Sequence, residues 1–230
     1  MPEHIGIVGC SAEGAALCYK TICVEAQKLM GAHRHPEVSM HTPPLELYMV
    51  ALTTGDWDSV GRIMADSASK LAQIGAEFAI CPDNTVHRGF DMAVAHSPIP
   101  WLHIADEVAA VAKKQGYRRL GILGTAYTMT GPVYPFSLEK QRIRHETPNE
   151  PDRFRIDQII MDELVHGVFT EPSRQYYNKV IQKFKTQGCD AAVLGCTEIP
   201  LLVDPNDCPL STLDSTRILA QAAIRRSLSN

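Results

Sequence analysis

The most reactive stretch of the sequence follows a short apolar run. Residues 79–85 read AICPDNT, where strand-like residues give way abruptly to polar ones. A thiol, a carboxylate, an amide and a hydroxyl come together there, in Cys81, Asp83, Asn84 and Thr85. A carboxylate can take or give a proton at a substrate carbon, and amide and hydroxyl groups can donate hydrogen bonds to an anion. The stretch therefore predicts proton transfer on a small anionic substrate.

A second stretch of the same kind lies near the C-terminal end of the sequence. Residues 192–198 read AVLGCTE, so that Cys196 also follows an apolar run and precedes polar residues. A thiol suits acid–base work because its reference pKa of about 8.5 can be lowered by nearby amides and helix N-termini. Thr197 could donate to a substrate carboxylate. Glu198 could orient a substrate ammonium group, or it could simply favour the first turn of a short helix.

Parallel strands are expected to position these groups. Apolar runs alternate with longer stretches of helical period, which is typical of an α/β protein with mainly parallel sheets. Strands are predicted at residues 4–9, 45–51, 76–81, 119–124, 142–146 and 190–195. Helices are predicted at residues 12–30, 57–74, 103–115, 153–166, 173–187 and 213–226. Glycines stand where helix C-caps favour them, at Gly31, Gly75, Gly116, Gly167 and Gly188.

Two segments of the chain are repeated in the same order. Residues 5–14 (IGIVGCSAEG) align without a gap on residues 120–129 (LGILGTAYTM). Residues 75–85 (GAEFAICPDNT) align without a gap on residues 188–198 (GCDAAVLGCTE), at nearly the same spacing. Such a repeat predicts a duplicated α/β unit. We therefore expect two pseudo-symmetric α/β domains, over residues 1–97 and 98–205, with a C-terminal helix within 206–230 returning to the first.

The second alignment pairs the two reactive stretches. It places Asp83 on Cys196, whereas Cys81 falls on an apolar strand position, Leu194. Strand C-terminal ends and domain interfaces often hold ligand sites, so we expect an active site in the cleft between the domains. If a pseudo-twofold axis relates the halves, Asp83 and Cys196 face each other across that cleft.

Two opposed proton-transfer groups are what stereoinversion at a carbon requires. One group removes a proton from one face and the other delivers a proton to the opposite face. The polar residues at the repeated turns could donate hydrogen bonds to a substrate carboxylate and to a carbanion-like transition state: Ser11, Asn84, Thr85, Thr125 and Thr197. Ser11 and Thr128 could either bind substrate or cap the helices that follow the turns.

The two ionisation states of an Asp/Cys pair differ in free energy. At reference pKa values, a carboxylate with a thiol lies below a carboxylic acid with a thiolate by about 4.6 pKa units, roughly 6 kcal/mol. Efficient racemisation in both directions requires a smaller difference between these states. Burial would raise the pKa of Asp83, and hydrogen-bond donors would lower the pKa of Cys196. Otherwise hydrogen should exchange unequally into the two enantiomers.

The same motifs carry a family resemblance. Residues 194–202 (LGCTEIPLL) resemble the second signature of the aspartate/glutamate racemase superfamily. Residues 84–87 (NTVH) resemble its first signature, and residues 121–129 (GILGTAYTM) resemble the turn that opens its second domain. The resemblance covers nearly the whole chain and is closest to the aspartate racemase and broad-specificity branch. It implies a cleft active site, no pyridoxal phosphate or other cofactor, and usually a homodimer.

One position departs from the family pattern. The usual two-cysteine members have a cysteine immediately before the Asn-Thr pair or one residue earlier, whereas here Asp83 is adjacent and Cys81 lies two residues further back. The family pattern and the internal repeat both favour Asp83. Because residues two apart on an extended backbone point the same way, Cys81 stays open as the second acid/base.

We therefore predict a cofactor-independent amino-acid racemase with aspartate as the favoured substrate. A glutamate or broad-specificity racemase is the nearest alternative. An arylmalonate-type decarboxylase needs only one proton donor, so an acid at position 83 argues against it. A silent amino-acid-binding protein would be stabilised by its ligand without removing the substrate α-hydrogen. His41, Thr42 and residues 131–136 are candidate contacts for the substrate side chain, and His87 is expected to pack beneath the site.

Composition excludes several other classes. The 230 residues have a net charge of −4, with 45% hydrophobic and 21% charged residues, which does not favour nucleic-acid binding. The N-terminal residues lack a signal-peptide pattern, and no window approaches the roughly 18 apolar residues of a membrane span. We therefore expect a soluble cytoplasmic protein. Seven cysteines without a CxxC pair, and histidines without HExxH, predict neither a disulfide framework nor a metal site.

Overall fold

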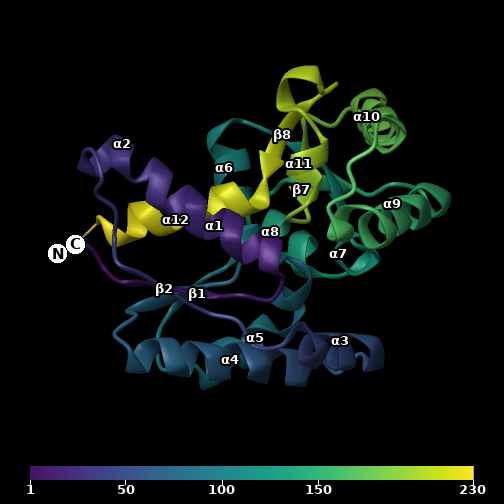
Figure 1. Cartoon of the computed structure of the whole chain (residues 1–230). Helices are drawn as coiled ribbons and strands as arrows, with labels where there is room; N and C mark the ends of the chain where they lie inside the picture. The colour runs from purple at the N-terminus through teal and green to yellow at the C-terminus, as the bar shows by residue number, and fades with distance from the viewer. Residues whose placement is uncertain (230) are drawn as a thin grey trace. The chain divides into compact units, whose positions relative to one another are not determined.

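The computed structural model describes residues 1–229, and the chain forms two compact units (Figure 1). Unit 1 comprises Met1–Glu107 together with the chain from Thr216 onward, and unit 2 comprises Val108–Ser215. Each unit contains one four-stranded sheet in which all paired strands are parallel. The α/β class predicted from the sequence is therefore confirmed.

The sheet of unit 1 has the strand order β2-β1-β3-β4. Its strands are β1 (Ile5–Val8), β2 (Val38–His41), β3 (Phe78–Ile80) and β4 (Trp101–Leu102). The helices α1 (Ala12–Glu25), α2 (Gln27–Met30) and α12 (Ser215–Ser227) cover one face (Figure 1). The other face is covered by α3 (Leu45–Thr54), α4 (Trp57–Gln73) and α5 (Phe90–His96), and a 3₁₀ helix spans Thr85–Gly89.

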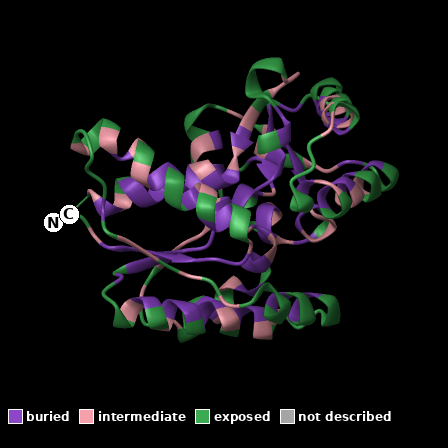
Figure 2. Ribbon diagram, in the orientation of Figure 1, coloured by how far each residue is buried: buried purple, intermediate pink, exposed green. Residues whose placement is uncertain are grey.

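Alternate residues of these strands build two cores, one on each face of the sheet. Ile5 and Ile7 of β1 pack with Ile22 of α1 and Leu219 of α12. Val8 packs on the other face, in a cluster that includes side chains from α3 and α4. This alternation follows from the period of two in a strand. The central strands β1 and β3 are buried, whereas the edge strands β2 and β4 are partly exposed. In Figure 2 the helices on either face have buried and exposed sides.

The sheet of unit 2 has the matching order β6-β5-β7-β8. Its strands are β5 (Arg119–Gly124), β6 (Arg144–Glu146), β7 (Ala191–Gly195) and β8 (Ser211–Asp214). Its helices are α7 (Ala126–Thr130), α8 (Val133–Lys140), α9 (Glu150–Asp162), α10 (Glu171–Thr186) and α11 (Ile199–Leu202), with α6 (Ile104–Lys114) beginning in unit 1. Two 3₁₀ helices span Leu164–His166 and Pro205–Asp207.

The strand registers confirm the internal repeat. In unit 1, Ile5 pairs with Phe78 between β1 and β3. The two gapless alignments place Ile5 on Leu120 and Phe78 on Ala191, and these two residues pair between β5 and β7. Both repeated segments therefore occupy the same strand positions and the same register in their units.

The strand predicted at residues 45–51 is wrong, because this segment is helix α3. Its apolar residues occur without a clear helical period, which resembles a buried strand. Pro44, the N-cap residue, begins the helix, and Gly55 ends it with a φ of 71°, in the left-handed region. The actual second strand is β2, a short edge strand without an apolar run. The sequence also did not predict strands β4 and β8, residues 90–96 and 199–202 as the helices α5 and α11, or the helices that follow β5 at residues 126–130 and 133–140.

The predicted C-cap glycines are confirmed. All five have a positive φ, between 71° and 97°, which favours glycine because it has no Cβ. They mark the ends of helices or the residue just beyond. The predicted helix at 12–30 is interrupted at Ala26, where α1 ends and α2 begins. Among residues 1–229, no helix combines the length and the apolar character that a membrane crossing needs.

Candidate functional site

Asp83 lies just beyond the C-terminal end of β3 and is held by Ser11. The Ser11 backbone N–H donates to the Asp83 Oδ2 atom at 3.0 Å, and the Ser11 hydroxyl donates to the same oxygen at 3.3 Å. Ser11 is also the N-cap of α1, since its Oγ accepts from the Gly14 N–H at 3.2 Å. Helix capping and contact with the candidate acid/base group are therefore combined in one side chain.

Gly9 allows the turn that brings Ser11 to this place. A Cβ atom at position 9 would lie 2.2 Å from the Thr42 Cγ2 atom and 3.1 Å from the Ala15 Cβ atom. No side chain larger than hydrogen fits there without movement of its neighbours. Thr42, a candidate contact for the substrate side chain, thus packs against the turn at Gly9.

Cys81 lies in the core of unit 1. Its side chain has no exposed surface and belongs to the cluster that includes Cys10 and Tyr48. Burial raises the pKa of the Cys81 thiol well above its usual range, and the Asp83 carboxylate raises it further. A thiol in this environment stays protonated at neutral pH and cannot reach solvent. Burial therefore argues against Cys81 as an acid/base group and favours Asp83, which is half-buried.

His87 packs beneath Asp83, as expected. Its Nδ1 atom donates to the Asp83 carbonyl at 2.8 Å, and its Nε2 atom accepts from the Ile104 N–H at 3.3 Å. Burial lowers the pKa of His87 well below its usual range, and the neighbouring His103 lowers it further. A neutral imidazole therefore bridges the turn after β3 and the start of α6. Asn84, which precedes the 3₁₀ helix, is buried, and Thr85 is half-buried.

Cys196 occupies the equivalent place after β7 in unit 2. Its Sγ atom donates to the Glu198 Oε2 atom at 2.9 Å. Thr197 and Glu198 are buried, whereas Cys196 is half-buried. The carboxylate therefore fixes the direction in which the thiol proton points. The structure thus pairs Glu198 with Cys196, a contact that the two-residue spacing alone did not indicate.

The turn after β5 holds the remaining candidates. Thr125 is the N-cap of α7, because its Oγ1 accepts from the Thr128 N–H at 3.3 Å. The hydroxyls of Thr125 and Thr128 lie 3.2 Å apart, and Thr128 is buried. A Cβ at Gly124 would lie 2.8 Å from the Gly195 carbonyl oxygen. Glycine therefore lets the end of β5 approach the end of β7, which carries Cys196.

His41 is turned toward α4. Its Nδ1 atom lies 3.0 Å from the Ser67 hydroxyl oxygen, and its Nε2 atom lies 3.3 Å from the Lys70 Nζ atom. Desolvation lowers the pKa of His41, and the Lys70 cation lowers it further. The imidazole is thus held within unit 1 by its neighbours. In the segment 131–136, Phe136 is largely exposed on α8.

Within each unit the structure brings the predicted residues together. Ser11 contacts Asp83 in unit 1, with Asn84 and Thr85 next in the chain. In unit 2, Cys196 contacts Glu198, and the two threonines of the β5 turn contact each other. Sequence reasoning missed two residues near these groups, the buried tyrosines Tyr48 and Tyr177. Their positions depend on α3 and α10 packing, for which the sequence has no motif.

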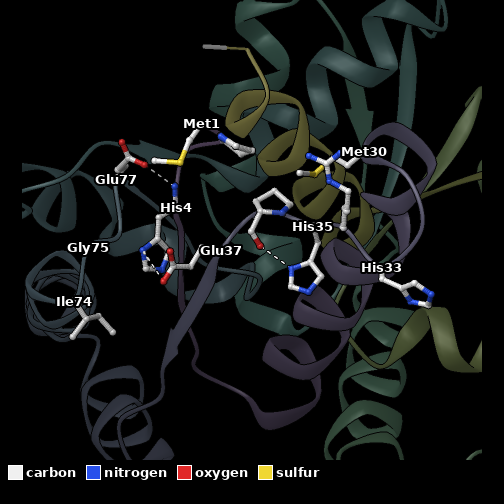
Figure 3. A pocket seen from close by; sticks show the side chains of 12 residues that line it. Met1, His4, Met30, His33, His35, Glu37, Ile74, Gly75 and Glu77 are labelled. Atoms are coloured by element: carbon white, nitrogen blue, oxygen red, sulfur yellow. Dashed lines mark hydrogen bonds and ion pairs between the residues drawn. The ribbon is translucent and has the colours of Figure 1, made fainter.

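A hollow in unit 1 lies at the other end of the strands (Figure 3). It has a volume of about 850 Å³, and His4, Glu37 and Glu77 of its lining each directly precede a strand. Glu77 accepts from the His4 backbone N–H at 2.7 Å (Figure 3). None of the predicted site residues lines it. Among the described residues, no cluster of three or more His, Cys, Asp or Glu side chains could hold a metal ion.

The chain belongs to the Asp/Glu/Hydantoin racemase family, whose pattern matches residues 6–223. It is therefore an amino-acid racemase, an isomerase, which confirms the resemblance seen in the sequence. A Yersinia pestis protein assigned to the Asp/Glu racemases is 33% identical, with a TM-score of 0.91 over 99% of this chain and 100% of that one. An aspartate racemase homologue from Pyrococcus horikoshii OT3 is 26% identical, with a TM-score of 0.85 over 99% of each chain. The broad specificity amino-acid racemase of Bacillus subtilis (strain 168) is 23% identical over 206 residues, 86% of each chain.

Proposed function

We propose that this racemase acts on aspartate without a cofactor, with Asp83 and Cys196 as its two acid/base groups. The observation that carries the proposal is the shared register of the two units. Asp83 and Cys196 therefore occupy equivalent places, because each is the third residue after the same position of the corresponding strand in its unit. The half-burial of both side chains supports access to a substrate.

In the proposed reaction the two groups act on opposite faces of the α-carbon. In one direction the Asp83 carboxylate takes the α-hydrogen as a proton, and the Cys196 thiol delivers its proton to the other face. In the reverse direction the Cys196 thiolate takes the proton and the Asp83 carboxylic acid delivers one. The reaction thus requires both strand ends to reach one substrate. Donors at the turns, among them Asn84, Thr85 and Thr197, would bind the substrate carboxylate and the developing negative charge.

Two features support the ionisation states that the first direction requires, a carboxylate at Asp83 and a thiol at Cys196. The two Ser11 donors stabilise Asp83 as a carboxylate, the form that takes the proton. Glu198 accepts a hydrogen bond from the Cys196 thiol, which favours the protonated form that delivers the proton.

The test is α-hydrogen exchange in deuterated water, followed by NMR, with L- and D-aspartate supplied separately and no cofactor added. We expect the wild type to exchange and invert aspartate, whereas Asp83→Asn and Cys196→Ala lose inversion. Either variant can keep exchange from one enantiomer only, because one base remains. Normal inversion by Asp83→Asn would refute its proposed role.

Cys81→Ala is the matched control for Asp83→Asn. This substitution removes a buried thiol two residues away and should leave inversion within a few-fold of the wild-type rate, since the thiol is not exposed. Loss of inversion in Cys81→Ala but not in Asp83→Asn would transfer the acid/base role to Cys81.

The substrate is decided by the same assay with other amino acids. The similar proteins include an aspartate racemase homologue and a broad specificity amino-acid racemase, so glutamate and neutral amino acids belong in the series. If any of these amino acids exchanges its α-hydrogen faster than aspartate does, that amino acid replaces aspartate as the proposed substrate. We also propose that the protein is a homodimer, which light scattering of the purified chain would test.

A further inference from the structure

Asp157 of α9 contacts the turn that follows β5 in unit 2. Its Oδ1 atom accepts a hydrogen bond from the Ala126 backbone N–H at 2.7 Å. This length is at the short end of the usual range, as is common when the acceptor is a carboxylate. Ala126 is the first residue of α7, so its N–H has no acceptor within that helix. The N-cap residue, Thr125, accepts from the Thr128 N–H. The first turn of α7 is therefore held by two side chains, one from the turn itself and one from α9.

Helix α9 gives Asp157 a fixed position. Ile156 and Ile160 of this helix are buried in the core of unit 2, in the same cluster as Met129 of α7. Helix α9 also contacts β5. Asp157 is half-buried, and among residues 1–229 the Ala126 N–H is the one group that donates a hydrogen bond to it. Its side chain therefore links a well-packed helix to the turn after β5.

The internal repeat gives this contact an equivalent in unit 1. The first gapless alignment places Ser11 on Ala126, and the second places Asp83 on Cys196. In unit 1 the Ser11 N–H donates to the Asp83 carboxylate at 3.0 Å. The equivalent N–H of unit 2 also donates to a carboxylate, but this one comes from α9. Asp83 thus holds its turn and is the proposed acid/base group, whereas in unit 2 these two tasks are divided between Asp157 and Cys196.

The turn that Asp157 contacts carries two candidate substrate-binding groups. The hydroxyl oxygens of Thr125 and Thr128 lie 3.2 Å apart. Hydroxyl groups bind a substrate more tightly when their positions are fixed before the substrate arrives. Because Ala126 lies between the two threonines in the chain, a hydrogen bond at its N–H restricts the backbone that carries both hydroxyls.

We propose that Asp157 is a positioning residue for substrate binding, which fixes the Thr125 and Thr128 hydroxyls through its hydrogen bond to the Ala126 N–H. Asp157 does not transfer a proton. The inference rests on the proposed function, because it takes these two hydroxyls as donors to the substrate carboxylate. The substrate keeps this carboxylate throughout racemisation, so losing the positioning should weaken binding of the substrate and of the transition state alike.

The test is the racemisation kinetics of Asp157→Ala and Asp157→Asn beside the wild type. Alanine removes the acceptor, and we expect KM to rise about tenfold with kcat within about twofold of the wild-type value, because the binding that is lost is uniform. Asparagine keeps an acceptor oxygen, so KM should stay within about threefold of the wild-type value. An unchanged KM in Asp157→Ala, or an equal rise in both variants, would overturn the inference.

Asp152→Ala is the matched control. Asp152 is a buried acid on the same helix, but it accepts from the Tyr176 hydroxyl at 2.8 Å and from the Lys183 ammonium group, both on α10. It shares no partner with Asp157, so its loss should weaken the packing of α9 and leave KM within about twofold of the wild-type value. Circular dichroism at the assay temperature should show that the variants are folded. A rise in KM equal to that of Asp157→Ala would show that any weakening of α9 has this effect, and would refute the specific role of Asp157.

Hydrogen exchange of the Ala126 amide in deuterated water, followed by NMR, gives a readout that needs no substrate. Ala126 and Asp157 both line a hollow of about 470 Å³, so water reaches this amide once its acceptor is removed. The amide should exchange about tenfold faster in Asp157→Ala than in the wild type or in Asp157→Asn. Equal exchange in all three proteins would refute the positioning role.

This second readout separates the inference from the proposed function. If the wild type leaves the α-hydrogen of aspartate in place, the proposed substrate is wrong, and the exchange of the Ala126 amide still decides whether Asp157 holds the turn. If the wild type racemises aspartate but Asp157→Ala keeps the wild-type KM, the proposed function stands and the positioning role of Asp157 fails.

Discussion

Replacing Ser11 by alanine tests whether this residue supports Asp83 as well as α1. The Ser11 hydroxyl accepts from the Gly14 N–H and donates to the Asp83 carboxylate. Alanine removes both bonds but keeps the backbone N–H that donates to the same carboxylate oxygen. The two lost bonds differ in kind, because one is a helix cap and the other is assisted by charge.

The expected loss of stability is the sum of two contributions. Removing a serine N-cap costs about 1 kcal/mol. A hydrogen bond to a charged group contributes about 1.5–3 kcal/mol, and the 3.3 Å length of this one places it at the lower end. Ser11→Ala should therefore lower the free energy of unfolding by about 2.5 kcal/mol. In an Asp83→Asn background the same substitution should cost about 1 kcal/mol less, because the remaining bond is between neutral groups.

Urea denaturation followed by tryptophan fluorescence measures this difference. Both tryptophans, Trp57 and Trp101, lie in unit 1, so their fluorescence reports the unit that contains Ser11. Ser11→Thr, which keeps the hydroxyl, is the control and should stay close to the wild type. An equal cost of Ser11→Ala in the wild-type and Asp83→Asn backgrounds would show that Ser11 only caps the helix.

Two further changes in unit 1 have calculable effects. Gly9→Ala should destabilise the unit by about 1–3 kcal/mol through overpacking, and adding Thr42→Ser should recover most of this, because it removes the methyl group 2.2 Å from the new Cβ. Urea denaturation of the single and double variants measures the recovery, and an unchanged cost in the double variant would contradict this packing. His87 has a folded-state pKa well below its usual range, so its contribution to stability is present above about pH 6.5 and is lost as the pH falls. The free energy of unfolding should therefore decline from pH 7 to pH 5, and His87→Gln should reduce the decline; equal slopes in both proteins would refute this explanation.

The central strands could be predicted from the sequence, and the edges of the sheets could not. β1, β3, β5 and β7 are buried, and their apolar runs and following glycines or polar turns are visible in the sequence. β2 has no apolar run because it is an edge strand. The apolar segment that follows it is a helix with Tyr48 buried, although Leu45, Leu47, Met49 and Val50 are exposed. The apolar pattern therefore did not predict this helix, because several of its apolar side chains are exposed to solvent and not buried.

The predicted site shows a similar division. The turn residues Ser11 and Thr125 could be identified because turns after parallel strands favour hydroxyl-bearing caps. The burial of Cys81, the contact between Cys196 and Glu198, and the position of Tyr177 depend on how helices pack against the sheets. These features involve residues that local spacing does not relate, so they became visible only in the structure.

The return of α12 to unit 1 has a consequence for synthesis. Leu219, Ala220, Ala223 and Ile224 of this helix complete the core on one face of the first sheet. Unit 2 is continuous in sequence, whereas unit 1 lacks these side chains until the last helix is made. At a synthesis rate of about 5–20 residues per second, the first unit waits on the order of ten seconds for its final element. On the ribosome the second unit can therefore complete its core before the first, and a nascent chain stopped before α12 would leave part of one apolar sheet face, beside α1, open to chaperones.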